Sequence, residues 1–227
     1  MFDGSKVSRK DNIKKTSKIV KRAHDAKVSV EGEIGFVGYA NGKSSEGTLP
    51  IEAVTFAKES NVDAMAISVG NTHLQTNKIA KIDLGKVKEI QKSISTPLVL
   101  HGGSGIPNPI RNKLARTTNI AKFNIGTELR MTFGNALRKQ VKNNPLIYDR
   151  LQLLNPTMPE ITKITKKIIK NFRPKYLATI FLATLNEDTP KLIKFYHTDV
   201  GKINASITLM TLIHVYKQHQ IINTGKG

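Results

Sequence analysis

Residues 62–70, VDAMAISVG, form a nearly continuous apolar run that ends in glycine. Such a run is typical of a strand in a parallel sheet, where both faces are covered. Similar runs that lead into glycine occur in TPLVLHGGSG (96–105) and NIAKFNIGT (119–127), and KVSVEGEIGFVG (27–38) alternates apolar and polar residues before its glycines. The sequence therefore predicts four strands, which begin near residues 28, 62, 97 and 120.

One helical pattern precedes the first of these strands, and another follows each of the four. Residues 11–25 carry apolar side chains at helical spacing, and Pro50 opens a helix that runs to about Ser60, as a first-turn proline does. Further helices are predicted at 84–93, 108–116 and 128–141. This alternation of strands and helices predicts an α/β fold with a parallel sheet.

Two parallel folds are compatible with this pattern. In a doubly wound open sheet, four or five strands complete the protein. In a (β/α)8 barrel, four strands are half of the fold, because eight units need roughly 250 residues. The pattern of strands and helices does not choose between them.

The composition narrows the class of protein. The chain has 227 residues, of which 39% are hydrophobic, and it contains no cysteine, so disulfides are excluded. No apolar run approaches the roughly 18 residues of a membrane span. The first ten residues, MFDGSKVSRK, lack the apolar middle of a secretory signal. We therefore expect a soluble, cytoplasmic protein with no membrane partner.

The formal charge is +19, from 36 Lys and Arg against 17 Asp and Glu. Nucleic-acid domains usually place basic residues on one face beside aromatic rings that stack on bases. Here the basic clusters are limited to 14–22 and 166–175, and aromatic residues are 6% with no tryptophan. The composition disfavours nucleic-acid binding, whereas a positive field would steer a phosphorylated metabolite toward the protein.

Ionisable side chains gather where the predicted strands end. Glu31 and Glu33 end the first strand, His73 follows the second, and His101 directly follows the third. In both folds the carboxyl ends of the strands meet at one edge, where ligands bind. Because neutral imidazoles are good zinc ligands, the two histidines predict a metal site that they do not complete alone.

The turn after His101 predicts an anion site. Gly102 and Gly103 allow close approach of the backbone, and Ser104 offers a hydroxyl at the start of a helix. Asn124 and Thr127 occupy the corresponding place after the last strand. An ordinary helix cap explains Ser104 or Thr127 singly. Their joint placement favours a phosphate cradle.

These residues lie in five segments with a recognisable order and spacing: MFDGS (1–5), VSVEGEIGFVG (28–38), VDAMAISVGNTHLQT (62–76), PLVLHGGSGIP (97–107) and AKFNIGTELR (121–130). With these motifs the chain resembles the class II, metal-dependent ketose-bisphosphate aldolases, which include the fructose- and tagatose-bisphosphate aldolases. The resemblance covers residues 1–172. It implies a partial (β/α)8 barrel of about four C-terminal βα units, that is, the C-terminal part of the family's fold.

The resemblance also implies an activity and a set of site residues. Members of this family are zinc-dependent lyases of glycolysis and related carbohydrate metabolism. They reversibly cleave a ketose bisphosphate, such as fructose 1,6-bisphosphate, into dihydroxyacetone phosphate and an aldehyde phosphate. By resemblance, His73 and His101 are two of three zinc-ligating histidines, and Asp3 and Glu33 lie near a second cation, monovalent or divalent. The residues implied for the phosphate are Gly102, Ser104, Asn124 and Thr127.

Two departures from the family pattern affect these expectations. Relatives carry an Asp-His pair that gives the proton-transferring aspartate and the third zinc histidine, whereas His24-Asp25 has the reverse order. We therefore expect the chain to be deficient as an aldolase unless an N-terminal barrel fragment or a homo-oligomer completes it. The alternative is a non-catalytic half-barrel that binds a sugar phosphate. Leu74 stands where many relatives have glycine, which predicts different loop packing.

Residues 173–227 lie beyond the resemblance. They form a predicted tail to which the sequence assigns no function.

Overall fold

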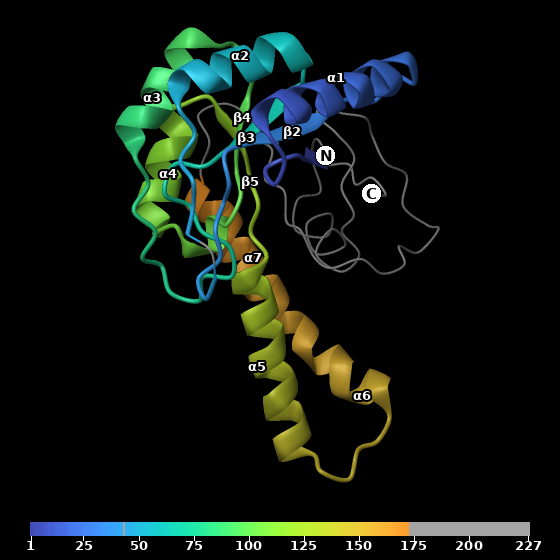
Figure 1. The fold of residues 1–227 in the computed structure, drawn as a ribbon. Coiled ribbons are helices and arrows are strands. Elements are labelled where there is room, and N and C mark those ends of the chain that lie inside the picture. The colour runs from blue at the N-terminus through green and yellow to red at the C-terminus, as the bar shows by residue number, and fades with distance from the viewer. Residues whose placement is uncertain (43, 173–227) are drawn as a thin grey trace.

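The computed structural model describes residues 1–42 and 44–172, so the predicted tail at 173–227 lies outside the described residues. The fold is a five-stranded parallel sheet in which each strand pairs with the strand that precedes it in the chain (Figure 1). The strands are β1 Phe2–Asp3, β2 Glu31–Ile34, β3 Ala64–Ile67, β4 Leu98–Leu100 and β5 Ile120–Phe123.

A helix follows each strand, as the sequence predicts. The helices are α1 Arg9–Asp25, α2 Pro50–Ser60, α3 Leu84–Ser93, α4 Asn108–Thr117, α5 Thr127–Asn143, α6 Arg150–Leu154 and α7 Met158–Phe172, with short 3-10 turns η1 Gly103–Gly105 and η2 Asn155–Thr157. The predicted bounds of the first five helices agree with the structure to within two residues. None of the described helices has the length and apolar character needed to cross a bilayer.

The strand order decides between the two folds that the pattern leaves open. A doubly wound sheet reverses its strand order at a switch point. Here the order β1-β2-β3-β4-β5 runs in one direction without reversal, as in a barrel wall. The described residues therefore form part of a (β/α)8-type barrel, and the doubly wound alternative is wrong.

Two details of the strand prediction need correction. The structure has five βα units rather than four, because the two-residue strand β1 is too short to show a periodic pattern. The strand β2 begins at Glu31 rather than at Val28. The amide of Val30 donates to the Asp63 carboxylate over 2.6 Å, so regular pairing starts one residue later.

The two faces of the sheet differ in side-chain size. One face packs Met65, Ile67 and Leu100 into the main core, with Phe56 of α2 and Ile90 of α3. On the opposite face, which we call the inner face, the buried apolar residues of the central strands are small and form a separate cluster of Ala64, Ala66 and Val99. The inner face therefore has room for long polar side chains from neighbouring strands.

The strand register aligns one row of residues across the inner face. Residues paired in parallel register project to the same side of a sheet. The paired row, in order from β1 to β5, is Asp3, Glu33, Ala66, Val99 and Lys122. Two of the predicted site residues, Asp3 and Glu33, are therefore neighbours by register.

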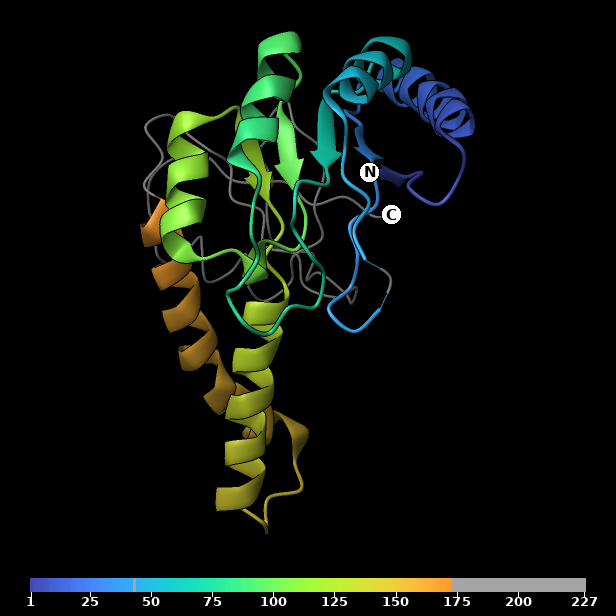
Figure 2. The same cartoon turned by 60° about the vertical axis from the view of Figure 1, so that its left-hand side comes forward.

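Helices α5 and α7 lie side by side and extend away from the sheet as an arm, with α6 near its tip (Figures 1 and 2). The arm joins the barrel wall through Phe172 at the end of α7. The ring of Phe172 lies 4.8 Å, between centroids, from that of Phe123 on β5. The start of α5, at the sheet end of the arm, belongs to the candidate site.

Candidate metal centre and phosphate cradle

Three ionisable side chains converge at the carboxyl ends of the strands. Glu33 lies on β2, His73 lies in the loop after β3, and His101 directly follows β4. Each of the three side chains offers one possible ligand atom, and these three atoms all lie within 4.8 Å of one another. Glu33 and His101 are each 3% exposed, and His73 is half-buried. The strand ends therefore bring the two predicted histidines together and add a carboxylate to them.

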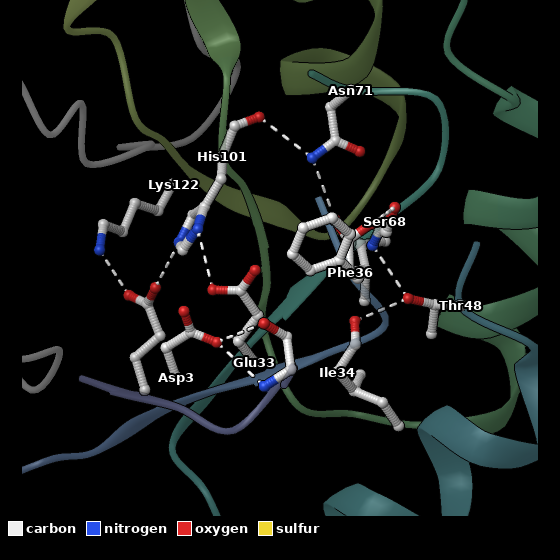
Figure 3. Close-up of polar contacts among 12 residues, drawn as sticks. Asp3, Glu33, Ile34, Phe36, Thr48, Ser68, Asn71, His101 and Lys122 are labelled. Atoms are coloured by element: carbon white, nitrogen blue, oxygen red, sulfur yellow. Dashed lines mark hydrogen bonds and ion pairs between the residues drawn. The ribbon is translucent and has the colours of Figure 1, made fainter. Parts of the chain in front are cut away.

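Both nitrogens of the His101 ring contact carboxylates (Figure 3). Nδ1 lies 3.2 Å from Oε2 of Glu33, and Nε2 lies 2.9 Å from Oε1 of Glu31. Burial alone lowers the pKa of His101, but the hydrogen bonds and charges of Glu31 and Glu33 outweigh it and raise the pKa to about 9. Without a bound cation, His101 is a positively charged group between two carboxylates.

His73 has a different environment. Its ring centroid lies 5.8 Å from that of His101. Its backbone is held to the preceding loop, since its amide donates to Gly38 over 2.7 Å and its carbonyl accepts from Ala40 over 3.0 Å. Burial and the neighbouring His101 charge lower the pKa of His73. The imidazole is therefore neutral at neutral pH, which is the form that binds metals.

Asp3 lies beside Glu33 on the inner face, but it is not part of the three-residue group. One of its carboxylate oxygens accepts from the amide of Ser5 over 3.0 Å and from its hydroxyl over 2.6 Å. Burial raises the pKa of Asp3, but the Ser5 bonds and nearby charges, including His101, bring it below its usual value. Asp3 is therefore an ionised carboxylate at the edge of the site, whereas the structure groups Glu33 with the two histidines.

The donor set fits a zinc ion. Zinc binds imidazole nitrogen and carboxylate oxygen, and catalytic zinc sites use three protein ligands and leave a fourth position for water or substrate. Glu33, His73 and His101 supply two nitrogens and one oxygen at suitable mutual distances. The chemistry of these donors therefore matches a zinc-type cation that retains an open position.

The glycine-rich turn after His101 is sterically restricted. Gly102 has a φ of 62°, and a Cβ atom there would lie 2.2 Å from the carbonyl oxygen of Thr72. The next amide, that of Gly103, donates to the carbonyl of Asn124 over 2.9 Å. Glycine is thus required at 102, and the turn is joined to the end of β5.

Ser104 connects this turn to the start of α5. Its hydroxyl oxygen accepts from the amide of Glu128 over 3.1 Å and so caps the helix from outside its own segment. Thr127 is the first residue of α5, and its hydroxyl accepts from Arg130 over 3.3 Å. The side-chain oxygen of Asn124 is buried and has no hydrogen-bond partner among the described residues. The predicted phosphate residues therefore occupy two joined turns.

Two polar residues that the sequence analysis does not assign also shape the site. Asn71 is fully buried, and its side-chain amide donates to the carbonyls of Ile67 over 3.2 Å and His101 over 3.1 Å (Figure 3). Lys122 hydrogen-bonds the carboxylate of Glu31. Lys122 could be found from the sequence, because it is a charged residue inside an otherwise apolar strand. Asn71 lies in a loop where asparagine is common, so its sequence position does not mark it as a site residue.

Leu74, where the resemblance leads us to expect glycine, adopts a left-handed backbone with a φ of 55° and is 54% exposed. This conformation destabilises a residue that has a side chain by roughly 1–2 kcal/mol. Glycine avoids that strain, but it loses more backbone entropy on folding, which offsets part of the gain in stability. We expect Leu74→Gly to stabilise the chain by about 0.5–1 kcal/mol in urea denaturation. The matched control is Leu146→Gly, at an exposed loop position outside the left-handed region, which should destabilise. Loss of stability in Leu74→Gly would contradict this account.

Sequence comparison with known proteins points to one family. The family described as fructose-bisphosphate aldolase class-II matches residues 1–175. The chain is 36% identical over 154 residues to a sulfofructosephosphate aldolase of Alkalicoccus urumqiensis, covering 65% of this chain and 53% of the relative. It is 33% identical over 176 residues to a fructose-bisphosphate aldolase of Staphylococcus epidermidis, covering 76% and 61%. The chain thus spans between half and two thirds of these relatives.

Solved structures show the same fold. The YdjI aldolase of Escherichia coli K12 superimposes with a TM-score of 0.58 at 27% identity, covering 79% of this chain and 61% of that one. The fructose-bisphosphate aldolase of Campylobacter jejuni gives a TM-score of 0.58 at 19% identity, covering 75% and 58%, and supports the fold alone. With the family match over residues 1–175, these similarities show that the chain belongs to the class II fructose-bisphosphate aldolase family.

Proposed function

We propose that this chain carries the metal centre and the phosphate cradle of a zinc-dependent lyase that cleaves a ketose bisphosphate, such as fructose 1,6-bisphosphate. The observation that carries the proposal is the convergence of Glu33, His73 and His101 beside the glycine-serine turn. A cation and a phosphoryl group can bind side by side there. The expected products are dihydroxyacetone phosphate and an aldehyde phosphate.

Each group of residues has a distinct task in this proposal. The turn at Gly102 and Ser104, with Asn124 and Thr127, holds the phosphate of the dihydroxyacetone half through backbone amides and polar side chains. This contact lies away from the breaking bond and fixes the substrate's orientation, which can supply several kcal/mol of the barrier. Asn124 would contact the phosphate through its side-chain NH2 group, which donates, whereas its buried and unpartnered side-chain oxygen is an acceptor and would take a hydrogen bond from a substrate hydroxyl.

Glu33, His73 and His101 would hold the metal. When bound, a divalent cation there supplies Lewis-acid chemistry at the carbonyl end of the substrate. The neutral ring of His73 is ready to bind it, whereas His101 must first release a proton. Asp3, an ionised carboxylate one strand from Glu33, is our candidate for a second cation, monovalent or divalent.

The proposed site is incomplete without further groups. Glu33, His73 and His101 make up the three-donor group, and the sequence contains no Asp-His pair of the kind expected for the family. In the described sheet, β1 and β5 each pair on one side only. We propose that an N-terminal barrel fragment supplies the remaining strands and the proton-transferring group, whereas a second copy of the chain could cover the open sheet edges but has no Asp-His pair to add.

An aldolase assay tests this proposal directly. We expect the purified chain to cleave fructose 1,6-bisphosphate little or not at all with zinc, yet to bind dihydroxyacetone phosphate in calorimetry. Adding the part of the Staphylococcus epidermidis aldolase that this chain does not match should restore cleavage that a chelator abolishes. Robust cleavage by the chain alone would contradict its expected deficiency.

The same experiment separates the alternative function. Phosphate-ligand binding without turnover in any mixture would favour the non-catalytic sugar-phosphate-binding half-barrel. Absence of both binding and cleavage in every combination would contradict both functions.

A further inference from the structure

Glu31 uses both of its carboxylate oxygens to join two basic side chains, the buried His101 and the partly buried Lys122. Oε1 lies 2.9 Å from Nε2 of His101, and Oε2 hydrogen-bonds Nζ of Lys122. The side chains of Glu31, His101 and Lys122 are 9%, 3% and 12% exposed.

The three side chains come from three different strands. Glu31 is on β2, His101 follows β4 and Lys122 is on β5. Strand β3 lies between β2 and β4, so these two strands are about 10 Å apart. At the positions that face Glu31 and Glu33, β3 carries only Ala64 and Ala66. These short side chains leave room for Glu31 and His101 to meet above β3.

Glu31 and Glu33 contact different nitrogens of the His101 ring. They are two residues apart on one strand and face the same side, so each takes one nitrogen of His101. Glu33, at Nδ1, belongs to the three-donor group with His73, whereas Glu31, at Nε2, does not. Because its two oxygens already contact Nε2 and Nζ, Glu31 is placed to orient His101 rather than to bind the ion.

We propose that Glu31, anchored by Lys122, is a positioning residue that holds the proton on Nε2 of His101 and points Nδ1 at the metal. This inference rests on the proposed metal site. A carboxylate that accepts from the second ring nitrogen of a metal-binding histidine fixes its tautomer and orientation and increases its basicity, and losing it typically costs about 10–100-fold in metal affinity. Lys122 acts one step further out, by holding the Glu31 carboxylate in place.

Metal titration of variants tests this role without an activity assay. Affinity for Zn²⁺ is measured by chelator competition, and ligand geometry by the visible spectrum of bound Co²⁺. We expect Glu31→Gln, which keeps an acceptor but loses the charge, to weaken Zn²⁺ binding about tenfold, and Glu31→Met to weaken it toward 100-fold. Both should change the Co²⁺ spectrum. Glu59→Gln, at an exposed position of α2, is the matched control and should change neither quantity.

A double variant keeps the test independent of folding. Glu31→Met alone removes the carboxylate from the partly buried Lys122, whereas Glu31→Met with Lys122→Met removes both members of the pair and should preserve the fold. We expect this double variant to retain a cooperative urea transition and still bind Zn²⁺ more weakly than the unmodified chain. Unmodified affinity and an unmodified Co²⁺ spectrum in the Glu31 variants would overturn the positioning role alone. Failure of the unmodified chain to bind either metal would overturn the proposed metal site, and the inference with it.

Discussion

Replacing His101 by alanine is expected to abolish zinc binding and to lower the free energy of unfolding of the metal-free chain by about 3–5 kcal/mol. The stability loss arises because Glu31 and Glu33 remain buried after their shared cationic partner is removed, and breaking a buried ion pair from one side costs about this much. The affinity loss follows because two donors hold zinc poorly. Urea denaturation and chelator competition measure the two effects.

His73→Ala is the matched control for this variant. It removes the other imidazole of the same metal group, so zinc affinity should fall about as far as in His101→Ala. His73, however, is half-buried and forms no ion pair among the described residues, so the free energy of unfolding should fall by only about 1 kcal/mol. Equal stability losses in the two variants would show that the carboxylates around His101 are not held by its charge.

Much of the fold follows from periodicity in the sequence. The apolar run at 62–70 and the similar runs after it predict β3, β4 and β5, and Pro50 marks the start of α2 where the structure has it. The strand β1 cannot be predicted in this way, because two residues are too few to show an alternating pattern. Periodicity also cannot choose between a barrel and a doubly wound sheet, because the order of the strands depends on tertiary packing.

The candidate site is predictable in outline and not in detail. His73 and His101 can be placed at one edge because parallel strands share their carboxyl ends. That Glu33 joins them, while Glu31 turns to the other nitrogen of the same ring, depends on the register of β2 and on the small side chains of β3. These are properties of the packed sheet, and the spacing of residues along the chain does not reveal them.

The metal-free chain is expected to become less stable as the pH rises from about 6.5 to about 9. The pKa of His101 is raised to about 9 from an ordinary 6.5, so below 6.5 the folded and unfolded states both hold the proton and the stabilisation is fully present. Between these values the folded state binds more protons, and stability falls with pH. Since one pH unit corresponds to about 1.4 kcal/mol, the total loss is roughly 3 kcal/mol.

The acid limb of the same profile comes from Glu31. Its pKa is lowered from 4.5 to about 2, so its stabilising contribution is present above 4.5 and is lost as the pH falls through 2. Because Glu31 and His101 are partners in one ion pair, the two limbs describe the same interaction, and their energies are not additive. The interaction is therefore strongest on the plateau between about pH 4.5 and 6.5.

Urea denaturation across this range, with chelator present, measures the profile, and His101→Ala separates the pair from every other titrating group. The variant should lose the alkaline decline that the unmodified chain shows, because no proton is then held at that position. A bound zinc ion should oppose the same decline, since it replaces the proton at Nδ1 and its affinity rises as the proton is released. If the unmodified chain were equally stable at about pH 6 and pH 9, His101 would not be held as a cation by Glu31 and Glu33.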